Sequence, residues 1–216
     1  MSYKTFIGYS SEDKNLAQYI HDCLERIVQI QPYLAEIYPS YGEDFKKTLQ
    51  NELYNSKFMV VLLTNNGICS QWVNQEIGYA YALKKRPRLL PALRDLPHII
   101  PISENQTELK GFITKDTIDI LFLDKYASFE LVIADIISTI RNYIPRGLEK
   151  GMLTVRITCS NCANDEGLPF EYEGSIPSHE TICKVIESDP QLLYEYICPS
   201  CNAKNVIDIR TFLPTQ

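Results

Sequence analysis

Short apolar segments alternate with amphipathic segments along the first two thirds of the chain. Five apolar runs have the length and the β-branched or aromatic content of strands. They lie at residues 5–9, 33–38, 58–63, 89–92 (or 99–102) and 118–123. Between them, apolar residues recur every three or four positions, which is the spacing of one helix face. Such segments lie at about residues 16–27, 45–53, 71–84 and 129–140.

This alternation predicts an α/β fold, because right-handed crossovers place parallel strands in one sheet with helices on its faces. The run FMVVLL at residues 58–63 is apolar at every position, as expected of a central strand that is buried on both faces. With five strands we expect a flavodoxin-like parallel sheet of order 2-1-3-4-5. In such sheets the ligand site lies beyond the carboxyl ends of strands 1 and 3. Here Tyr9, Ser10 and Ser11 follow the first strand, and residues 65–72 follow the third.

Composition removes several classes of protein from consideration. The chain has 216 residues, of which 45% are hydrophobic and 22% are charged, as in an ordinary globular protein. Its net charge of −6 argues against nucleic acid as a partner. The longest apolar run is far shorter than the roughly 20 residues of a membrane span, and the first residues lack the features of a signal peptide. We therefore expect a cytoplasmic protein without a membrane partner.

The segment Pro145-Arg146-Gly147-Leu148-Glu149-Lys150-Gly151 ends a helical pattern with one proline and two glycines, which are residues typical of a linker. All four cysteines that occur in C-x-x-C pairs follow this segment. We predict two domains, at residues 1–145 and 146–216.

The predicted helix at residues 71–84 carries Trp72 and Glu76, which lie four residues apart and share a face. That face differs from the one formed by Val73, Ile77 and Ala80. An aromatic ring beside a carboxylate suits a nucleotide, because the ring can stack on a base and the carboxylate can bind ribose hydroxyls. The same spacing is also typical of a tryptophan that covers the start of a helix and a glutamate that is solvated at the surface.

Three segments of the chain resemble the TIR (Toll/interleukin-1 receptor) domain family. KTFIGYSSEDKNLA is similar to its first-strand motif. SKFMVVLLTNNGICSQWVNQEIGYA is similar to its third strand and following helix, with Ser70, Trp72 and Glu76 in the pattern of members that cleave NAD+. The turn with Ser40, Tyr41 and Gly42 falls where the mobile BB loop of the family lies. The resemblance covers about residues 3–143.

This resemblance implies that the chain is an NAD+ glycohydrolase or ADP-ribosyl cyclase of prokaryotic immune signalling, such as antiviral defence. Glu76 would be the catalytic residue. The substrate contacts would come from Trp72, Tyr9, Ser10, Ser11, Ser40, Tyr41 and Gly42. The resemblance also implies homo-oligomers formed through TIR–TIR contacts. Two other functions remain open: a TIR adaptor without catalysis, and an enzyme that resembles nucleoside deoxyribosyltransferases.

The sequence pairs Cys159 with Cys162 and Cys198 with Cys201, each as C-x-x-C. Two such pairs can supply the four thiolates of a structural, tetrahedral Zn²⁺ site. Predicted strands at residues 155–158, 194–197 and 206–209 complete the outline of a small β-rich zinc ribbon. Residues 166–191 would loop out between the pairs, with a short helix near 181–187. Another ligand set, in which His179 and Cys183 join the first pair, leaves the second pair unused.

Overall fold

The computed structural model describes residues 2–34, 43–85, 97–104, 109, 113, 119–144, 153–164, 171–188 and 193–208. The chain divides into two compact units. The first comprises residues 1–21 and 31–127, and the second comprises residues 22–30 and 128–216. The predicted boundary between residues 145 and 146 lies outside the described residues.

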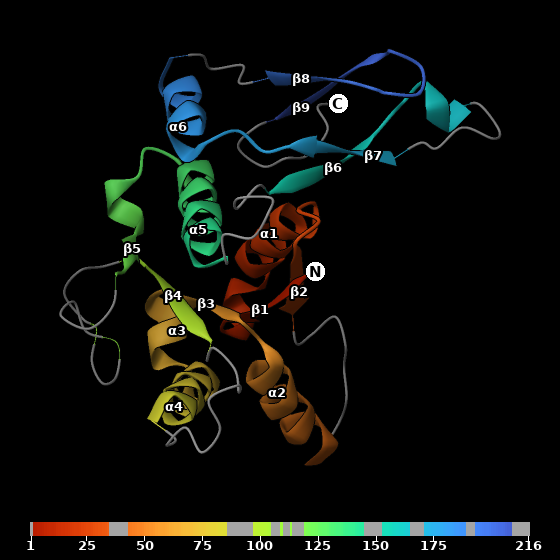
Figure 1. Cartoon of the computed structure of the whole chain (residues 1–216). Helices are drawn as coiled ribbons and strands as arrows, with labels where there is room; N and C mark the ends of the chain where they lie inside the picture. Colours follow the sequence, from red (N-terminus) through yellow and green to blue (C-terminus); the bar gives the residue numbers. More distant parts are fainter. Residues whose placement is uncertain are drawn as a thin grey trace. The chain divides into compact units, whose positions relative to one another are not determined.

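The first unit is built on a five-stranded sheet of order β2-β1-β3-β4-β5, as predicted. Its strands are β1 (Tyr3–Gly8), β2 (Ile30–Leu34), β3 (Phe58–Leu63), β4 (His98–Ser103) and β5 (Leu121–Phe122). Central β3 pairs in parallel with β1 and β4, with Val60 opposite Ile7 and Ile100. Figure 1 shows these strands within the red-to-green part of the chain. The flavodoxin-like α/β topology is therefore confirmed.

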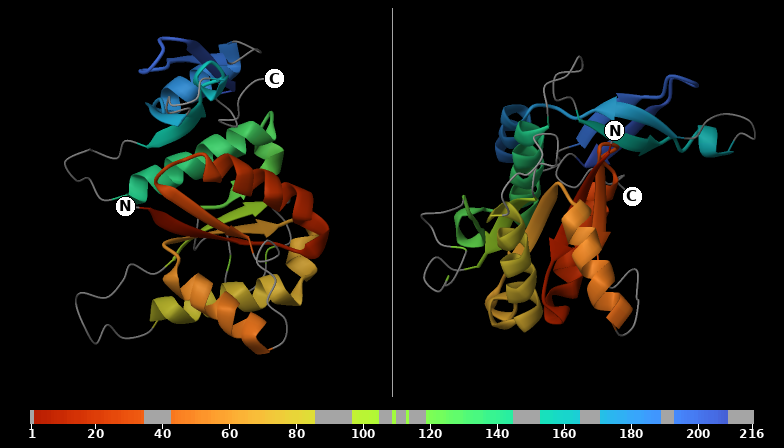
Figure 2. Two further views of the ribbon diagram at one scale, coloured as in Figure 1. Left: turned by 90° about the vertical axis from the view of Figure 1, so that its right-hand side faces the viewer. Right: turned by 60° about the horizontal axis from the view of Figure 1, so that its bottom comes forward.

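Helices join these strands in the first unit. They are the 3-10 helix η1 (Ser11–Asp13), α1 (Lys14–Glu25), which crosses into the second unit, α2 (Glu43–Asn55), α3 (Asn65–Cys69), α4 (Gln71–Lys85) and the 3-10 helix η3 (Leu123–Lys125). Figure 2 (left) shows α2 and α4 together on one face of the sheet. None of the described helices is both long enough and apolar enough to cross a membrane.

Every residue of β3 is buried, as predicted for a central strand. Alternate β3 side chains join one apolar core with side chains from β1, α2 and α4. Its buried members include Phe6, Leu49, Leu53, Met59, Val61, Leu63, Val73, Ile77 and Ala80. The predicted apolar face of α4 packs in this core. Trp72 and Glu76 lie on another face of the same helix.

Two strand predictions differ from the structure or are settled by it, and one short helix was not predicted. Strand β2 begins at Ile30, three residues earlier than predicted, and residues 35–38 lie outside the described part of the chain. Of the two alternatives for the fourth strand, the structure has the second, His98–Ser103. The short helix α3, which follows β3, was not predicted. The Oγ1 of Thr64 caps α3 by accepting a hydrogen bond from the Gly67 N–H at 2.9 Å.

Among its described residues, the second unit contains two antiparallel hairpins and two helices that lie wholly within it. β6 (Thr154–Thr158) pairs with β7 (Glu171–Ser175), and β8 (Leu193–Ile197) pairs with β9 (Lys204–Asp208). The helices are α5 (Phe129–Tyr143) and α6 (His179–Ser188), with the 3-10 helix η4 (Cys162–Asn164) after the first cysteine. The prediction that residues 166–191 loop out was therefore wrong at residues 171–175. Strand β7 was missed because its sequence, EYEGS, lacks an apolar alternation.

Gly174 of β7 lets the two hairpins approach each other. A Cβ at this position would lie 2.3 Å from Cε1 of Tyr196, which is far inside van der Waals contact. The Tyr196 hydroxyl donates a hydrogen bond of 3.0 Å to the Ser175 carbonyl. This tyrosine of β8 is therefore held against β7 by ring packing and by a hydrogen bond. These contacts join the strands that bring the two cysteine pairs together.

Candidate functional site

A cleft of about 290 Å³ lies in the first unit, at the carboxyl end of β1 and beside the start of α4. Its lining residues come from β1, η1, α2 and the region that begins α4. They are Ile7, Tyr9, Ser11, Phe45, Leu49, Ser70, Trp72 and Glu76. The position agrees with the topological rule for ligand sites in open parallel sheets. Tyr9, Ser11, Trp72 and Glu76, which were predicted from separate parts of the sequence, share this one cleft.

The start of α4 fixes the positions of Trp72 and Glu76. The Ser70 Oγ accepts a hydrogen bond of 3.4 Å from the Val73 N–H, as a capping residue does. Val73 and Ile77 then anchor the helix in the core. Glu76 lies one turn after Trp72 on the same face, which differs from the face of Val73 and Ile77, so both side chains reach the cleft. Ser70, the first residue of the motif in the sequence, lines the cleft as well.

The Glu76 carboxylate is the most unusual group in the cleft. Its Oε2 is buried, and among the described residues no group donates a hydrogen bond to it. A Cβ at Gly8 would lie 2.8 Å from this oxygen, so the glycine at the end of β1 leaves the space that the carboxylate occupies. Burial raises the pKa of Glu76 to about 8. A buried acid with an open acceptor is typical of a binding or catalytic group.

Trp72 forms one wall of the cleft together with Phe45 of α2. Their ring centroids are 5.9 Å apart and the rings meet edge to face at 64°. The tryptophan is nevertheless 46% exposed. A large, partly exposed ring that is held by a second aromatic residue can stack on a planar ligand at little cost in conformational entropy.

A buried hydrogen-bond network fixes the two chain segments that border the crevice. Asp13 of η1 accepts a hydrogen bond of 2.6 Å from the Thr64 hydroxyl and one of 3.1 Å from the Asn66 side chain. Its own N–H donates to the Ser10 carbonyl at 2.8 Å. The segment after β1 is thereby tied to the segment after β3. Sequence reasoning missed this network, since nothing local distinguishes Asp13 from other acidic residues near a helix start.

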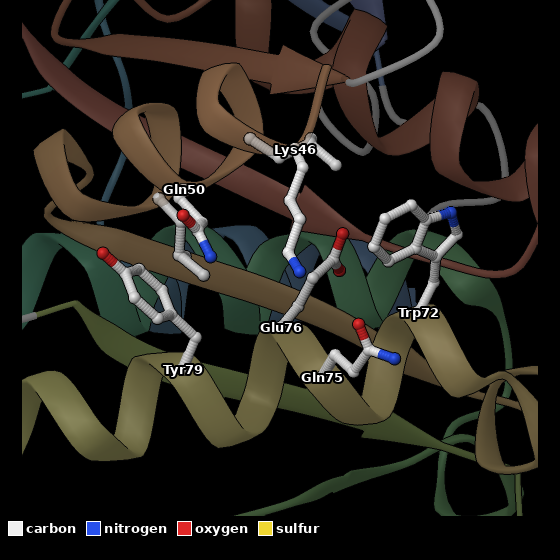
Figure 3. A pocket seen from close by; sticks show the side chains of 8 residues that line it. Lys46, Gln50, Trp72, Gln75, Glu76 and Tyr79 are labelled. Atoms are coloured by element: carbon white, nitrogen blue, oxygen red, sulfur yellow. The ribbon is translucent and has the colours of Figure 1, made fainter. Parts of the chain in front are cut away.

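A second, smaller hollow of about 50 Å³ lies between α2 and α4 and shares Leu49, Trp72 and Glu76 with the cleft. Its other lining residues are Lys46, Gln50, Leu53, Gln75 and Tyr79. Figure 3 shows the Lys46 side chain extending from α2 toward Glu76. Sequence analysis did not identify Lys46. The only available signal was a lysine one residue after Phe45, at the start of an amphipathic helix.

Of the other predicted substrate contacts, only Ser10 lies among the described residues. Ser10 precedes η1, and its carbonyl is used within that turn. Ser40, Tyr41 and Gly42, the predicted loop residues, lie outside the described residues. The described part of the site is therefore formed by β1, η1, α2 and α4.

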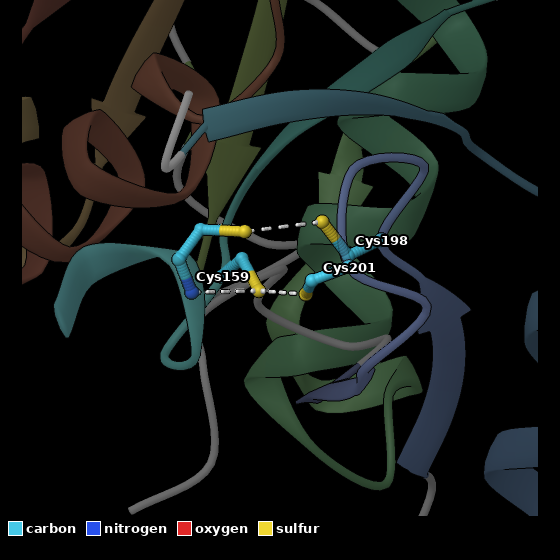
Figure 4. Close-up of side chains that lie close together, drawn as sticks. Cys159, Cys198 and Cys201 are labelled. Atoms are coloured by element: carbon cyan, nitrogen blue, oxygen red, sulfur yellow. Dashed lines mark hydrogen bonds between the residues drawn. The ribbon is translucent and has the colours of Figure 1, made fainter. Parts of the chain in front are cut away.

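Four cysteines form a second cluster, in the second unit (Figure 4). The ligand atoms of Cys159, Cys162, Cys198 and Cys201 all lie within 4.8 Å of one another. Two Sγ–Sγ distances, between Cys159 and Cys201 and between Cys162 and Cys198, are 3.6 and 3.7 Å. The edge of a tetrahedral ZnS₄ site is about 3.8 Å long, because a Zn–S bond measures about 2.3 Å. The cluster thus has the size and donor set of a tetrahedral metal site.

The backbone around the cysteines supports the same interpretation. The Cys162 N–H lies 3.5 Å from the Cys159 Sγ, and this contact lowers the pKa of the Cys159 thiol. Asn202 has a positive φ of 58° directly after the second pair, and its N–H donates to the Cys198 carbonyl at 2.9 Å. Each pair therefore lies in a tight turn. The structure brings the second pair to the first, so the alternative set with His179 and Cys183 was wrong.

The raised pKa of Glu76 gives an expected dependence of stability on pH. In the unfolded chain this carboxyl loses its proton near its ordinary pKa of 4.5, but in the folded chain only near 8. Between these values the folded state holds more protons, so this group's contribution to the free energy of unfolding falls as pH rises. Glu76→Gln cannot ionise. We expect it to be more stable than the parent chain by a few kcal/mol at pH 8.5, since one pKa unit corresponds to about 1.4 kcal/mol.

Urea unfolding of the parent chain and Glu76→Gln at several pH values would measure this difference. The advantage of Glu76→Gln should grow from pH 5 to pH 8.5. A difference that stays constant over this range would contradict the buried, protonated carboxyl. Glu171→Gln, which changes an exposed carboxyl of β7, is the control and should leave the pH dependence unchanged.

Comparison with known proteins yields one family. A family model described as TIR domain matches residues 5–121, which is more than half of the chain and includes every described residue that lines the cleft. A search of curated proteins finds no match.

Proposed function

We propose that this chain, which belongs to the TIR domain family, is an NAD⁺ nucleosidase with Glu76 as its catalytic residue. It cleaves the bond between nicotinamide and ribose. The products are nicotinamide and either ADP-ribose or a cyclic isomer of it. The observation on which the proposal rests is the buried Glu76 Oε2, which has no donor among the described residues and faces a cleft that also contains a partly exposed tryptophan.

One carboxylate is enough for this reaction. Hydrolysis of an O-glycoside needs a second carboxyl group to protonate the leaving oxygen. The nicotinamide of NAD⁺ is already a cation and departs as a neutral molecule, so no acid is required. Glu76 would accept hydrogen bonds from the ribose hydroxyls and would stabilise the positive charge that develops on the ribose. Substrate hydroxyls would supply the donors that Oε2 lacks.

Burial has a second consequence for the same group. A carboxyl with a pKa of about 8 is largely protonated at neutral pH before substrate binds. A cation placed beside a carboxyl favours its ionised form. Binding of the positively charged nicotinamide riboside moiety would therefore lower the pKa of Glu76 and produce the carboxylate that the reaction needs.

The aromatic wall and the polar rim would hold the rest of the substrate. Trp72, supported by Phe45, offers a ring on which adenine or nicotinamide can stack. Tyr9, Ser10 and Ser11 lie after β1 and are proposed to contact the substrate, as are Ser40, Tyr41 and Gly42 of the BB loop segment. Lys46 would supply the positive charge for the pyrophosphate.

Lys46→Met is expected to raise the KM for NAD⁺ about tenfold with little change in kcat. This corresponds to the loss of about 1.4 kcal/mol, as for one charge-assisted hydrogen bond. Steady-state kinetics would measure it. Lys47→Met is the matched control, because Lys47 is the next residue on α2 and does not line the hollow. With nicotinamide riboside, which has no pyrophosphate, the two variants should have the same KM. If Lys46→Met and Lys47→Met also had the same KM for NAD⁺, the assignment of Lys46 would be contradicted.

We also propose that Cys159, Cys162, Cys198 and Cys201 hold a structural Zn²⁺. The four sulfurs fit the tetrahedral size, and four thiolates leave no open coordination position. The ion would act by fixing the hairpins β6–β7 and β8–β9, so that residues 146–216 form a small zinc-ribbon domain after the TIR domain at 1–145. It would take no part in NAD⁺ cleavage.

The proposed setting is cytoplasmic immune signalling in prokaryotes, such as antiviral defence, with homo-oligomers formed through TIR–TIR contacts. We expect neither nucleic acid nor a membrane as a partner of this protein.

The deciding experiment is incubation of the purified chain with NAD⁺ at low and high protein concentration, followed by chromatography and mass analysis. Release of nicotinamide would support the enzyme, and the second product would distinguish hydrolysis from cyclisation. Cleavage of nucleosides but not NAD⁺ would favour a deoxyribosyltransferase-like enzyme. Absence of turnover at every concentration, together with self-association, would favour an adaptor.

A further inference from the structure

The second unit contains a cysteine, a histidine and an aspartate in contact, outside both the cleft and the four-cysteine cluster. His179 and Cys183 lie one turn apart on α6, and Asp135 lies on α5, which packs beside α6 (Figure 1). The His179 Nε2 is 2.5 Å from the Asp135 Oδ1. The Cys183 Sγ lies 3.4 Å from the same Nε2 and 3.9 Å from Nδ1.

The donor and acceptor chemistry assigns a role to each ring nitrogen. An ionised carboxylate can only accept, so the Nε2 beside Asp135 must carry a hydrogen. In the neutral ring, Nδ1 is then the acceptor. The Cys183 sulfur lies to the side of the ring, 3.9 Å from Nδ1 and 3.4 Å from Nε2, so a rotation of the Cys183 side chain aims the thiol at Nδ1. Asp135 thereby holds His179 in the tautomer that can take a proton from Cys183.

We propose that Cys183 is a reactive thiol that forms mixed disulfides with small-molecule disulfides, with His179 as its base and Asp135 as the positioning residue. The imidazole Nδ1 takes the thiol proton, and the Cys183 sulfur attacks one sulfur of the disulfide. The S–S bond of the reagent breaks, and the departing thiolate takes the proton back from the imidazolium. One disulfide and one thiol are consumed, and one mixed disulfide and one thiol are formed.

The surroundings of Cys183 fit this role. Its side chain and those of His179 and Asp135 are partly exposed, so a small reagent can reach the sulfur. Of the charged neighbours on α6, Lys184 is already paired with Glu180 at 2.5 Å. On α5, Arg141 donates to the Pro177 carbonyl at 3.0 Å and so holds the segment that leads into α6. The sulfur–imidazole pair thus lies at a junction fixed by two polar contacts with α5.

The chain provides its own reference thiol. Cys69 is exposed at the end of α3 and has no histidine contact among those found in the described residues. The thiolate is the reacting species, and an ordinary thiol with a pKa near 8.5 is only a few per cent ionised at pH 7. A nearby base should raise the rate at Cys183 about tenfold over that at Cys69.

The test exposes the full-length chain to glutathione disulfide at pH 7, with an acid quench and mass spectrometry of peptides that contain each cysteine. We expect Cys183 to react about tenfold faster than Cys69. His179→Gln and Asp135→Asn should reduce the rate at Cys183 and leave the rate at Cys69 unchanged. Equal rates at the two cysteines of the parent chain would overturn the proposal, as would an unchanged rate in His179→Gln.

A second measurement separates a proton-accepting role from a structural one. At a pH well above 8.5 the thiol ionises without a base, so the Cys183 rate of His179→Gln should rise to that of the parent chain. A deficit that persists at high pH would mean that the substitution only disturbs α6, and would overturn the role of His179. Neither measurement depends on NAD⁺ cleavage.

Discussion

Glu76→Ala and Glu76→Gln are each expected to abolish nicotinamide release from NAD⁺, with a loss of at least about a hundredfold in kcat. Removal of one group that stabilises charge in a transition state typically costs a factor of about 10² to 10³. Glu76 is the acid whose buried oxygen faces the cleft without a donor among the described residues. Glutamine keeps the shape of the side chain but cannot carry the negative charge that the developing cation requires.

Chromatography of the reaction products, beside circular dichroism of each variant, would check this result. Glu171→Gln is the matched control, since it makes the same chemical change at an exposed carboxyl of β7. It should retain full activity. Nicotinamide release by folded Glu76→Gln at a rate within threefold of the parent chain would remove Glu76 from the mechanism.

Removal of the proposed metal is expected to have the second largest effect. Cys198→Ser should reduce bound zinc from about one equivalent to nearly none and should leave β8 and β9 without protection from hydrogen exchange. Structural zinc sites contribute on the order of 10 kcal/mol to the folding of small domains. Cys198 is fully buried in the cluster, and its N–H donates to the Ala203 carbonyl at 2.9 Å within the same turn.

Metal analysis of freshly purified protein and hydrogen exchange of its peptides would measure both effects. Cys69→Ser replaces an exposed cysteine of α3 and should keep the metal and the protection. A parent chain that contains less than half an equivalent of zinc would contradict the assignment. So would a Cys198→Ser variant whose β8–β9 hairpin exchanges as slowly as that of the parent chain.

Local patterns were sufficient for most elements of the fold. The apolar run at Phe58–Leu63 identified the central strand with its observed bounds, because a strand buried on both faces has no polar position. Prediction failed where the pattern was short or polar. Helix α3 has only five residues and is fixed by the Thr64 cap, and β7 is a polar strand that is held by its partner β6.

Local sequence patterns are enough to specify the α/β topology, the common face of Trp72 and Glu76, and the pairing of cysteines within each C-x-x-C. Each depends on residues a few positions apart, whose relation is set by helix or turn geometry. Three other features arise only in the folded chain: Gly8 leaves space for Glu76, burial raises the pKa of that acid, and Asp135 contacts His179. These features join residues far apart in the chain, so they depend on packing rather than on local periodicity.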